Sequence, residues 1–423
     1  FPYTTLFRSK FFPKNNIVKY LKVRGSYGEV GNDQIGGDRF LYLPSSYGAA
    51  SDSGVNKYNF GLASNPYTSL MIVENKIGNP DLTWEKAKKM NVGVDINLFN
   101  NCLTASFDIF KEKRNNILAN RSTSPMIIGA NLPAYNFGEM ENRGWEMDLN
   151  FRHHIQDFHY WARFNYSFAR NEIIYMDEVQ KRYDYQMTTG RRKNQFFGLI
   201  FDGYYNSWEE INALDRPKSS WSGNQLQPGD VKYVDVNQDG VIDDYDMVPI
   251  GYTPVPEIIY GFSFGAQYKG FDFSILFQGA DNVSIKYFGR SMWPFAKGEE
   301  SAKSLIKERW TQERYEAGEK ITFPRLSLNP NGETDHNYRP STLWIRDASY
   351  LRLKNLEVGY TFTGGFVKRL NLNSVRLYFN GSNLFTWTDV VDLDPEAPSR
   401  SGNVEINTYP LQKVYNIGLN INF

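Results

Sequence analysis

The sequence predicts an all-β fold, a large antiparallel transmembrane β-barrel with long extracellular loops. Three observations predict it. Apolar side chains recur at every second position in segments longer than an ordinary strand. The connections between these segments alternate between tight turns and long loops. Aromatic residues make up 16% of the chain and glycines number 34, a composition typical of strands and turns.

The alternating segments are the expected barrel strands. In 145–151, the apolar Trp145, Met147 and Leu149 alternate with polar neighbours. Such alternation places one face of a strand in an apolar medium and the other in a polar one. The pattern predicts about ten barrel strands, and it is clearest in 90–96, 103–109, 145–151, 158–168, 262–268, 271–277, 375–379 and 415–423.

The connections differ between the two ends of the expected barrel. Tight turns fall at 99–101, 154–157 and 269–270, whereas long links occupy about 29–82, 119–137, 175–256, 284–346 and 387–408. Short turns on one side and long loops on the other are typical of membrane barrels. Two short helices are expected within the loops. One follows the capping box of Ser207 and Glu210, and the other spans 301–313.

A soluble β-sandwich is the alternative fold, because a half-buried sheet shows the same alternation. Aromatic side chains near the strand ends and charged residues on the opposite faces favour the barrel. The chain carries 47 basic and 47 acidic residues. This balance lacks the cationic excess that nucleic-acid binding needs, so no nucleic-acid partner is expected.

Residues 1–9, FPYTTLFRS, match the conceptual translation of a sequencing adapter. We interpret them as a non-native tail, with a native start as the alternative, and 10–423 as the barrel portion. The single cysteine, Cys102, excludes an internal disulfide framework. The four histidines show no zinc-ligand spacing.

A calcium-type loop is predicted at 235–246, DVNQDGVIDDYD. Positions 1, 3, 5, 7, 9 and 12 of such a loop are Asp235, Asn237, Asp239, Val241, Asp243 and Asp246. Gly240 stands at the sharp turn of position 6, and Ile242 is the apolar residue of position 8. Hard oxygen ligands suit Ca²⁺, which would be structural here. The flanks are not helical, position 12 is the shorter Asp, and an Asx-turn loop without metal is the alternative.

Several motifs resemble the SusC/RagA family of TonB-dependent outer-membrane transporters. They are LKVRGSYGEVGN (21–32), NRGWEMDLNF (142–151), GDVKYVDVNQDGVIDDYDMVPIGYTPVPEIIYGFSFGAQYKGFDFSILFQG (229–279), LWIRDASYLRLKNLEVGYTF (343–362) and RLYFNGSNLFTWTD (376–389). The alternating C-terminal segment ending at Phe423 also resembles an outer-membrane insertion signal.

The resemblance implies a location in the cell outer membrane, in contact with its lipid. It implies import of oligosaccharides or other oligomeric nutrients, peptides included, with a SusD-like surface lipoprotein as lid and energy from the TonB complex. It further implies that the chain is the C-terminal portion of a larger barrel, without the plug and the TonB-contacting segment. We therefore expect an open, curved sheet with two unpaired edges, or a forced smaller closure.

Two other function classes stay open at this point. A secreted polysaccharide hydrolase with a calcium-stabilised β-fold would need two carboxylates flanking a cleft, and the sequence pairs none. An outer-membrane adhesin or scaffold barrel would use the same long loops for protein contacts. Loop aromatics are candidates for stacking on sugars or for packing loop against loop: Trp208, Trp221, Trp293, Trp387 and Tyr338.

Overall fold

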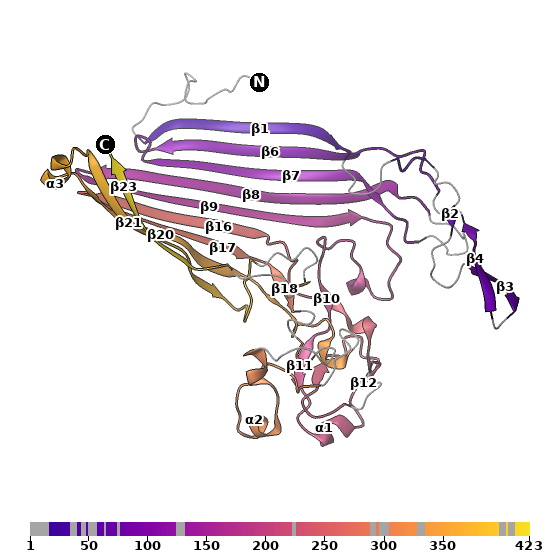
Figure 1. Cartoon of the computed structure of the whole chain (residues 1–423). Helices are drawn as coiled ribbons and strands as arrows, with labels where there is room; N and C mark the ends of the chain where they lie inside the picture. The colour runs from indigo at the N-terminus through magenta and orange to yellow at the C-terminus, as the bar shows by residue number, and fades with distance from the viewer. Residues whose placement is uncertain are drawn as a thin grey trace.

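Ten long antiparallel strands form the main sheet of this computed structural model (Figure 1). In spatial order they are β1 (Val18–Asn32), β6 (Glu85–Leu98), β7 (Leu103–Ala119), β8 (Tyr135–Ile155), β9 (Phe158–Tyr175), β16 (Ile258–Tyr268), β17 (Phe271–Asp281), β20 (Tyr350–Phe362), β21 (Ser374–Thr388) and β23 (Val414–Asn422). The structure describes residues 17–33, 40–43, 48–49, 57–62, 65–73, 77–123, 132–221, 226–287, 293–295, 304–327, 335–396, 403–404 and 411–423.

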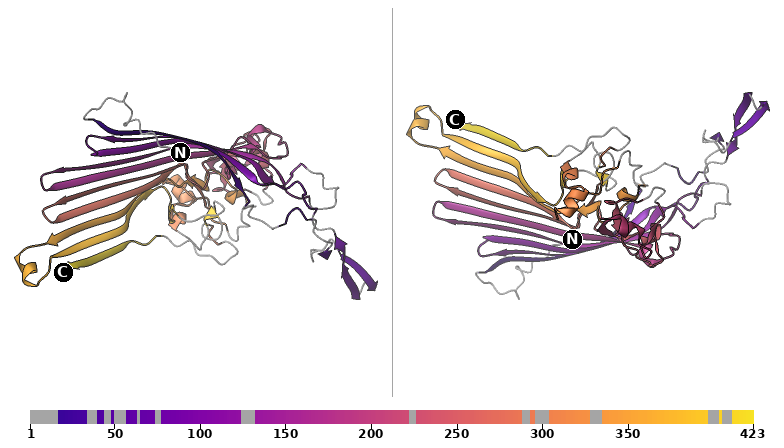
Figure 2. Two further views of the ribbon diagram at one scale, coloured as in Figure 1. Left: turned by 90° about the horizontal axis from the view of Figure 1, so that it is seen from above. Right: turned by 90° about the horizontal axis from the view of Figure 1, so that it is seen from below.

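The sheet is open and curved, as the sequence predicts. Its strand order begins at β1 and ends at β23, and no pairing between these two edges occurs among the described residues. Figure 2 shows the strands fanning between the two free edges, with the loop segments gathered at one end. The predicted tail at 1–9 lies outside the described residues, so its interpretation stays a prediction.

The register confirms the alternation. Phe164 pairs with Leu149 on β8 and with Phe262 on β16, so apolar side chains form rows across one face. Phe264 is 36% exposed and Leu419 is 56% exposed. An apolar face left open in this way suits hydrocarbon rather than a packed protein interior. We call it the apolar face and its opposite the polar face.

The tight turns form where the sequence places them. Phe99, Asn100 and Asn101 all have positive φ, as do Gln156 and the Lys269–Gly270 pair. Positive φ at consecutive residues matches the twist of the strands that a two-residue hairpin joins. These turns define the turn end of the sheet, where α3 (Gly365–Arg369) connects β20 to β21. The opposite end is the loop end.

The loops carry short elements. The strands are β2 (Gly48–Ala49), β3 (Lys57–Leu62), β4 (Asn65–Leu70), β5 (Ile72–Val73), β10 (Phe197–Gly198), β11 (Phe201–Tyr204), β12 (Lys218–Ser219), β13 (Val231–Tyr233), β14 (Val241–Ile242), β15 (Val248–Pro249), β18 (Ser284–Tyr287), β19 (Ile345–Asp347) and β22 (Asn403–Val404). The helices are α1 (Trp208–Asn212) and α2 (Gln312–Glu316), with 3₁₀ turns at Asp184–Gln186, Asp244–Asp246, Ser304–Glu308 and His336–Tyr338. None of the helices in the described ranges is long and apolar enough to cross a membrane.

One of the two loop helices forms as predicted. Ser207 accepts a hydrogen bond from the Glu210 backbone and starts α1. The continuous helix predicted at 301–313 is wrong over its described part, which divides into a 3₁₀ turn and α2. The reason is that Trp310 donates its backbone N–H to Phe323 (2.8 Å) in a short bridge, which interrupts the helical hydrogen bonds.

The loops between β9 and β16 and between β17 and β20 share a hydrophobic core, which we call the loop core. Its most enclosed members come from separate segments: Leu199, Val231, Tyr287, Phe323, Tyr338, Trp344 and Ala348. The Trp344 indole donates to the Asn337 carbonyl (2.7 Å), so its polar atom is satisfied inside this core. The loops therefore pack on one another at the loop end.

Candidate functional site

The polar face carries ion pairs that join neighbouring strands. Arg24 on β1 reaches Asp95 on β6 at 2.9 Å and Asp108 on β7 at 2.8 Å. Arg376 on β21 binds Asp272 on β17 and Glu357 on β20 in the same manner. A face with this many charged side chains suits contact with water rather than with hydrocarbon.

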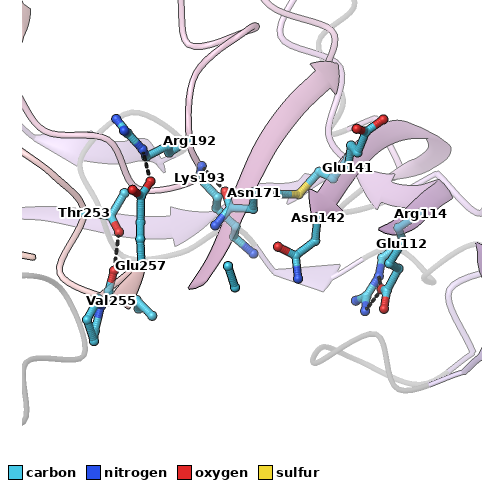
Figure 3. A pocket seen from close by; sticks show the side chains of 13 residues that line it. Glu112, Arg114, Glu141, Asn142, Asn171, Arg192, Lys193, Thr253, Val255 and Glu257 are labelled. Atoms are coloured by element: carbon cyan, nitrogen blue, oxygen red, sulfur yellow. Dashed lines mark hydrogen bonds and ion pairs between the residues drawn. The ribbon is translucent and has the colours of Figure 1, made fainter. Parts of the chain in front are cut away.

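A pocket of about 380 Å³ lies at the loop end of this face (Figure 3). Strands β7, β8 and β9 form one wall, and the segments at 192–193 and 253–257 form the other. Its lining is mostly charged or amide-bearing: Glu112, Arg114, Met140, Glu141, Asn142, Ala169, Asn171, Arg192, Lys193, Thr253, Val255, Pro256 and Glu257.

The carboxylates of the pocket are paired. Glu112 contacts Arg114 at 2.8 Å, and Glu141 contacts Lys111 at 2.9 Å. The most enclosed is Glu257, which binds Arg170 at 2.8 Å and also binds Arg192. A further hydrogen bond to Glu257 comes from the Asn282 amide (3.1 Å).

Burial alone would raise the pKa of Glu257, but the hydrogen bonds from Arg170 and Arg192 outweigh it. The pKa is therefore lowered and the carboxylate stays charged. A fixed, paired charge of this kind holds the pocket wall in place. It offers hydrogen-bonding groups to a ligand but no free nucleophile or base.

Sequence reasoning missed this pocket. Arg170 and Glu257 are 87 residues apart, and Arg192 and Glu257 are 65 apart. No local spacing links them, because the contact exists only once β9 and β16 pair. The position of Glu257 immediately before the alternating run of β16 was the one available signal.

Some of the loop aromatic side chains pack in the loop core, and others are exposed to solvent. Trp293 and Tyr338 lie in the loop core with ring centroids 5.3 Å apart, which confirms the packing role for them. Trp221 packs against the same core and lies under the Arg339 guanidinium at 4.1 Å. Trp208 on α1 and Trp387 on β21 are exposed.

The loop at 235–246 adopts part of the predicted arrangement. Gly240 has φ +83°, the left-handed turn expected at position 6. Ile242 is buried, and β14 pairs in parallel with β12. Asp246 is fully buried and accepts the backbone N–H groups of Val236 (2.8 Å) and Asp243 (2.8 Å).

The remaining predicted ligands face their own backbone. Asp235 accepts from Gly240 N–H (2.8 Å), Asp239 from Val241 N–H (2.9 Å), and Asp243 from Tyr245 N–H (2.7 Å). The side-chain oxygen Oδ1 of Asn237 accepts from the Asp239 backbone N–H (2.9 Å). Over the described ranges, no three His, Cys, Asp or Glu side chains converge as a metal cage. The residues are of the right type, but they are not gathered around one point.

Two features of the loop nevertheless concentrate negative charge. The second oxygen of Asp235, Oδ1, is buried and has no hydrogen-bond partner among the residues that the structure describes. Burial raises the pKa of Asp246, and the nearby charge of Asp235 adds to the rise against the backbone hydrogen bonds. Burial is the larger cause of the raised pKa of Asp246, and the Asp235 charge is a smaller one.

Comparison with known proteins decides the family. The sequence model of the protein family described as 'TonB dependent receptor-like, beta-barrel' matches residues 2–384. The chain belongs to this family. TonB-dependent receptor β-barrels are outer-membrane proteins, and the relatives that the chain resembles are receptors rather than enzymes. The short turns of the sheet therefore face the periplasm and the long loops face the exterior.

Two relatives illustrate the extent of the likeness. TonB-dependent receptor P3 of Formosa agariphila is 27% identical over 98% of this chain, and TonB-dependent receptor SusC of Bacteroides thetaiotaomicron is 26% identical over 98%. The chain spans only 40% and 38% of these relatives' lengths.

Solved structures share the fold. The RagAB peptide importer in its open-open state superposes with a TM-score of 0.71 at 22% identity, covering 99% of this chain and 42% of that one. A second structure of the RagAB peptide transporter gives a TM-score of 0.68 at 23% identity, covering 98% and 42%.

Proposed function

We propose that this chain forms part of the wall and the extracellular mouth of a nutrient importer. Its cargo would be an oligosaccharide or another oligomeric nutrient such as a peptide. The polar face carries the proposal, because its cross-strand ion pairs and the pocket around Glu257 at its loop end have the polarity expected of the inner wall of a transport barrel. Charged side chains that are already ion-paired can form hydrogen bonds with a polymer along its length, but they bind it with low affinity.

The partners follow from the family. A SusD-like surface lipoprotein would sit over the loop end, and the TonB complex would supply energy from the periplasm. The likeness to SusC supports this assembly. The loop end also presents apolar side chains to solvent, among them Trp208 and Leu214, as a protein-binding surface does.

We expect deletion of the gene to abolish growth on one oligomeric nutrient while growth on its monomer is unchanged. The measurement is growth on single carbon or nitrogen sources, with complementation by the intact gene. Co-purification from detergent-extracted outer membranes tests the lipoprotein partner. Normal growth on every source tested, with loss of surface attachment, would favour the adhesin alternative instead.

We also propose that the loop at 235–246 binds a structural Ca²⁺. Six positions supply suitable oxygen atoms, and the unpartnered oxygen of Asp235 lies within this acidic loop. Binding requires Asp235, Asp239 and Asp243 to turn from backbone N–H groups towards the ion. The stabilisation comes from relief of carboxylate repulsion, which reaches several kcal/mol at ~5 Å and intermediate dielectric.

Calorimetry with EDTA-stripped protein tests this site. We expect about one equivalent of Ca²⁺ to bind and to slow proteolysis of the loop. The variant D239N should weaken binding, whereas D202N, outside the loop in β11, should not. Absence of heat with the stripped protein, or equal effects of the two variants, would contradict the proposal.

A further inference from the structure

Three of the chain's four histidines and its single cysteine lie at the turn end of the sheet. His153 and His154 close strand β8, His159 stands near the start of β9, and Cys102 precedes β7. They are close in space although the sequence shows no metal-ligand spacing, because the hairpin of β8 and β9 folds them together. This end of the sheet faces the periplasm.

His154 and His159 are direct cross-strand partners. Both side chains belong to the polar face, and their ring centroids are 5.5 Å apart with an interplanar angle of 25°. The tight turn at Gln156, with φ +53°, fixes the two strands at this register. The imidazoles are therefore held side by side by the backbone rather than brought together by flexible loops.

Two neighbouring imidazoles of this kind can chelate one metal ion. Nitrogen atoms bound at ~2.0–2.1 Å lie about 3.3 Å from each other on a tetrahedral metal and about 2.8 Å apart at neighbouring positions of a square-planar Cu²⁺. Two rings this close reach such a separation by side-chain rotation alone. Imidazole suits Zn²⁺, Cu²⁺ and Ni²⁺, and affinity rises to a maximum at Cu²⁺.

Water would complete the coordination shell of a metal ion bound by the two imidazoles. The pair borders a shallow hollow of about 240 Å³, lined also by Arg152, His153, Tyr160 and Trp161. In the described part of the chain, no third His, Cys, Asp or Glu completes a cage. The nearby Arg152 cation lowers the affinity for a metal ion, so binding is weaker than at a closed structural site.

His153 provides a matched comparison on the opposite face. Its Nδ1 lies 3.5 Å from the Cys102 sulfur, and its ring meets Tyr160 edge-on at 5.8 Å. Its ring centroid is 6.1 Å from that of His154, but its cross-strand partner is Tyr160 rather than His159, because successive side chains of a strand point to opposite faces.

We propose that His154 and His159 form a two-nitrogen chelate for a divalent transition metal, tightest for Cu²⁺, at the periplasmic rim. This site lies at the turn end of the polar face, away from the pocket around Glu257 and from the proposed Ca²⁺ loop at the loop end. A bound ion links β8 to β9 and stabilises the folded hairpin by mass action.

Titration of the detergent-purified, metal-stripped protein with Cu²⁺ and Zn²⁺ tests the proposal. We expect one equivalent to bind, with Cu²⁺ tighter, and electron paramagnetic resonance to show coupling to imidazole nitrogen. H154Q and H159Q should each weaken binding at least about tenfold, since even groups that only orient a ligand are worth ~10–100-fold. H153Q should bind as the parent protein does.

Full binding by H154Q or H159Q would overturn the proposal, as would an equal loss in H153Q. Full binding would place the metal elsewhere, and an equal loss in H153Q would show that the site is not the His154–His159 pair. All three side chains are exposed, so the variants should keep the fold. Resistance to unfolding by SDS, measured without metal, checks that the variants are folded. If this resistance is equal in every variant, a difference in Cu²⁺ affinity is due to the lost imidazole and not to unfolding.

Discussion

Replacing Arg352 with methionine is expected to destabilise the loop end of the protein by about 3–5 kcal/mol. The Arg352 side chain is 1% exposed on β20, and it binds Asp394 at 2.6 Å and Glu396 at 3.2 Å. Methionine keeps much of the volume but leaves both carboxylates enclosed without their main counter-charge. Chemical unfolding followed by tryptophan fluorescence measures the loss.

A triple variant with both carboxylates neutralised separates charge from packing. R352M combined with D394N and E396Q should recover much of the stability, because no buried charge is left unpaired. A triple variant as unstable as R352M would show that packing of the guanidinium, not the ion pairs, holds the segment at 389–396 against β20.

The same contact predicts a pH dependence. Burial alone would raise the pKa of Asp394, but the hydrogen bonds from Arg352 and from the backbone of Glu396 and Leu411 lower it overall. A carboxylate whose pKa is lower in the folded protein than in the unfolded chain stabilises the fold at pH values above its unfolded pKa. This stabilisation is lost as the pH falls through the pKa of the folded state. The difference between the parent protein and R352M should therefore shrink on acidification.

Period-two alternation predicted the sheet well where each strand is uninterrupted. β9 reads as alternating over most of its length, and its register with β16 is regular from Ile258 to Tyr268. β20 was less readable, because its register with β21 shifts between Leu353 and Asn355 and the alternation changes phase there. β1 is likewise weak, since glycines take several of its positions.

The site was less predictable than the sheet for a physical reason. Alternation shows only which face of a strand a residue occupies. A pocket also depends on which distant segments come into contact, and alternation does not show this. Glu257 meets Arg170 across a strand pair and Arg192 across a loop. The pairing of His154 with His159 needed the hairpin register. A calcium-type loop is different, because all of its ligands lie within twelve consecutive residues and spacing alone suggests it.

Phe164→Arg and Asn165→Arg should differ sharply, although the two positions are adjacent on β9. Phe164 lies on the apolar face midway along the paired part of β9, and an arginine there costs about 2–4 kcal/mol at the bilayer midplane. Asn165 lies on the polar face opposite Asp148, where an arginine gains a cross-strand partner worth ~0.2–1 kcal/mol.

The measurement is the fraction of protein in isolated outer membranes that resists SDS unfolding without heating. We expect F164R to lower this fraction severely and N165R to leave it near the parent level. The comparison isolates the face, because both variants add the same side chain at the same depth. Equal losses would mean that the two faces meet similar surroundings, which would remove the basis for a membrane-facing surface and a watery interior.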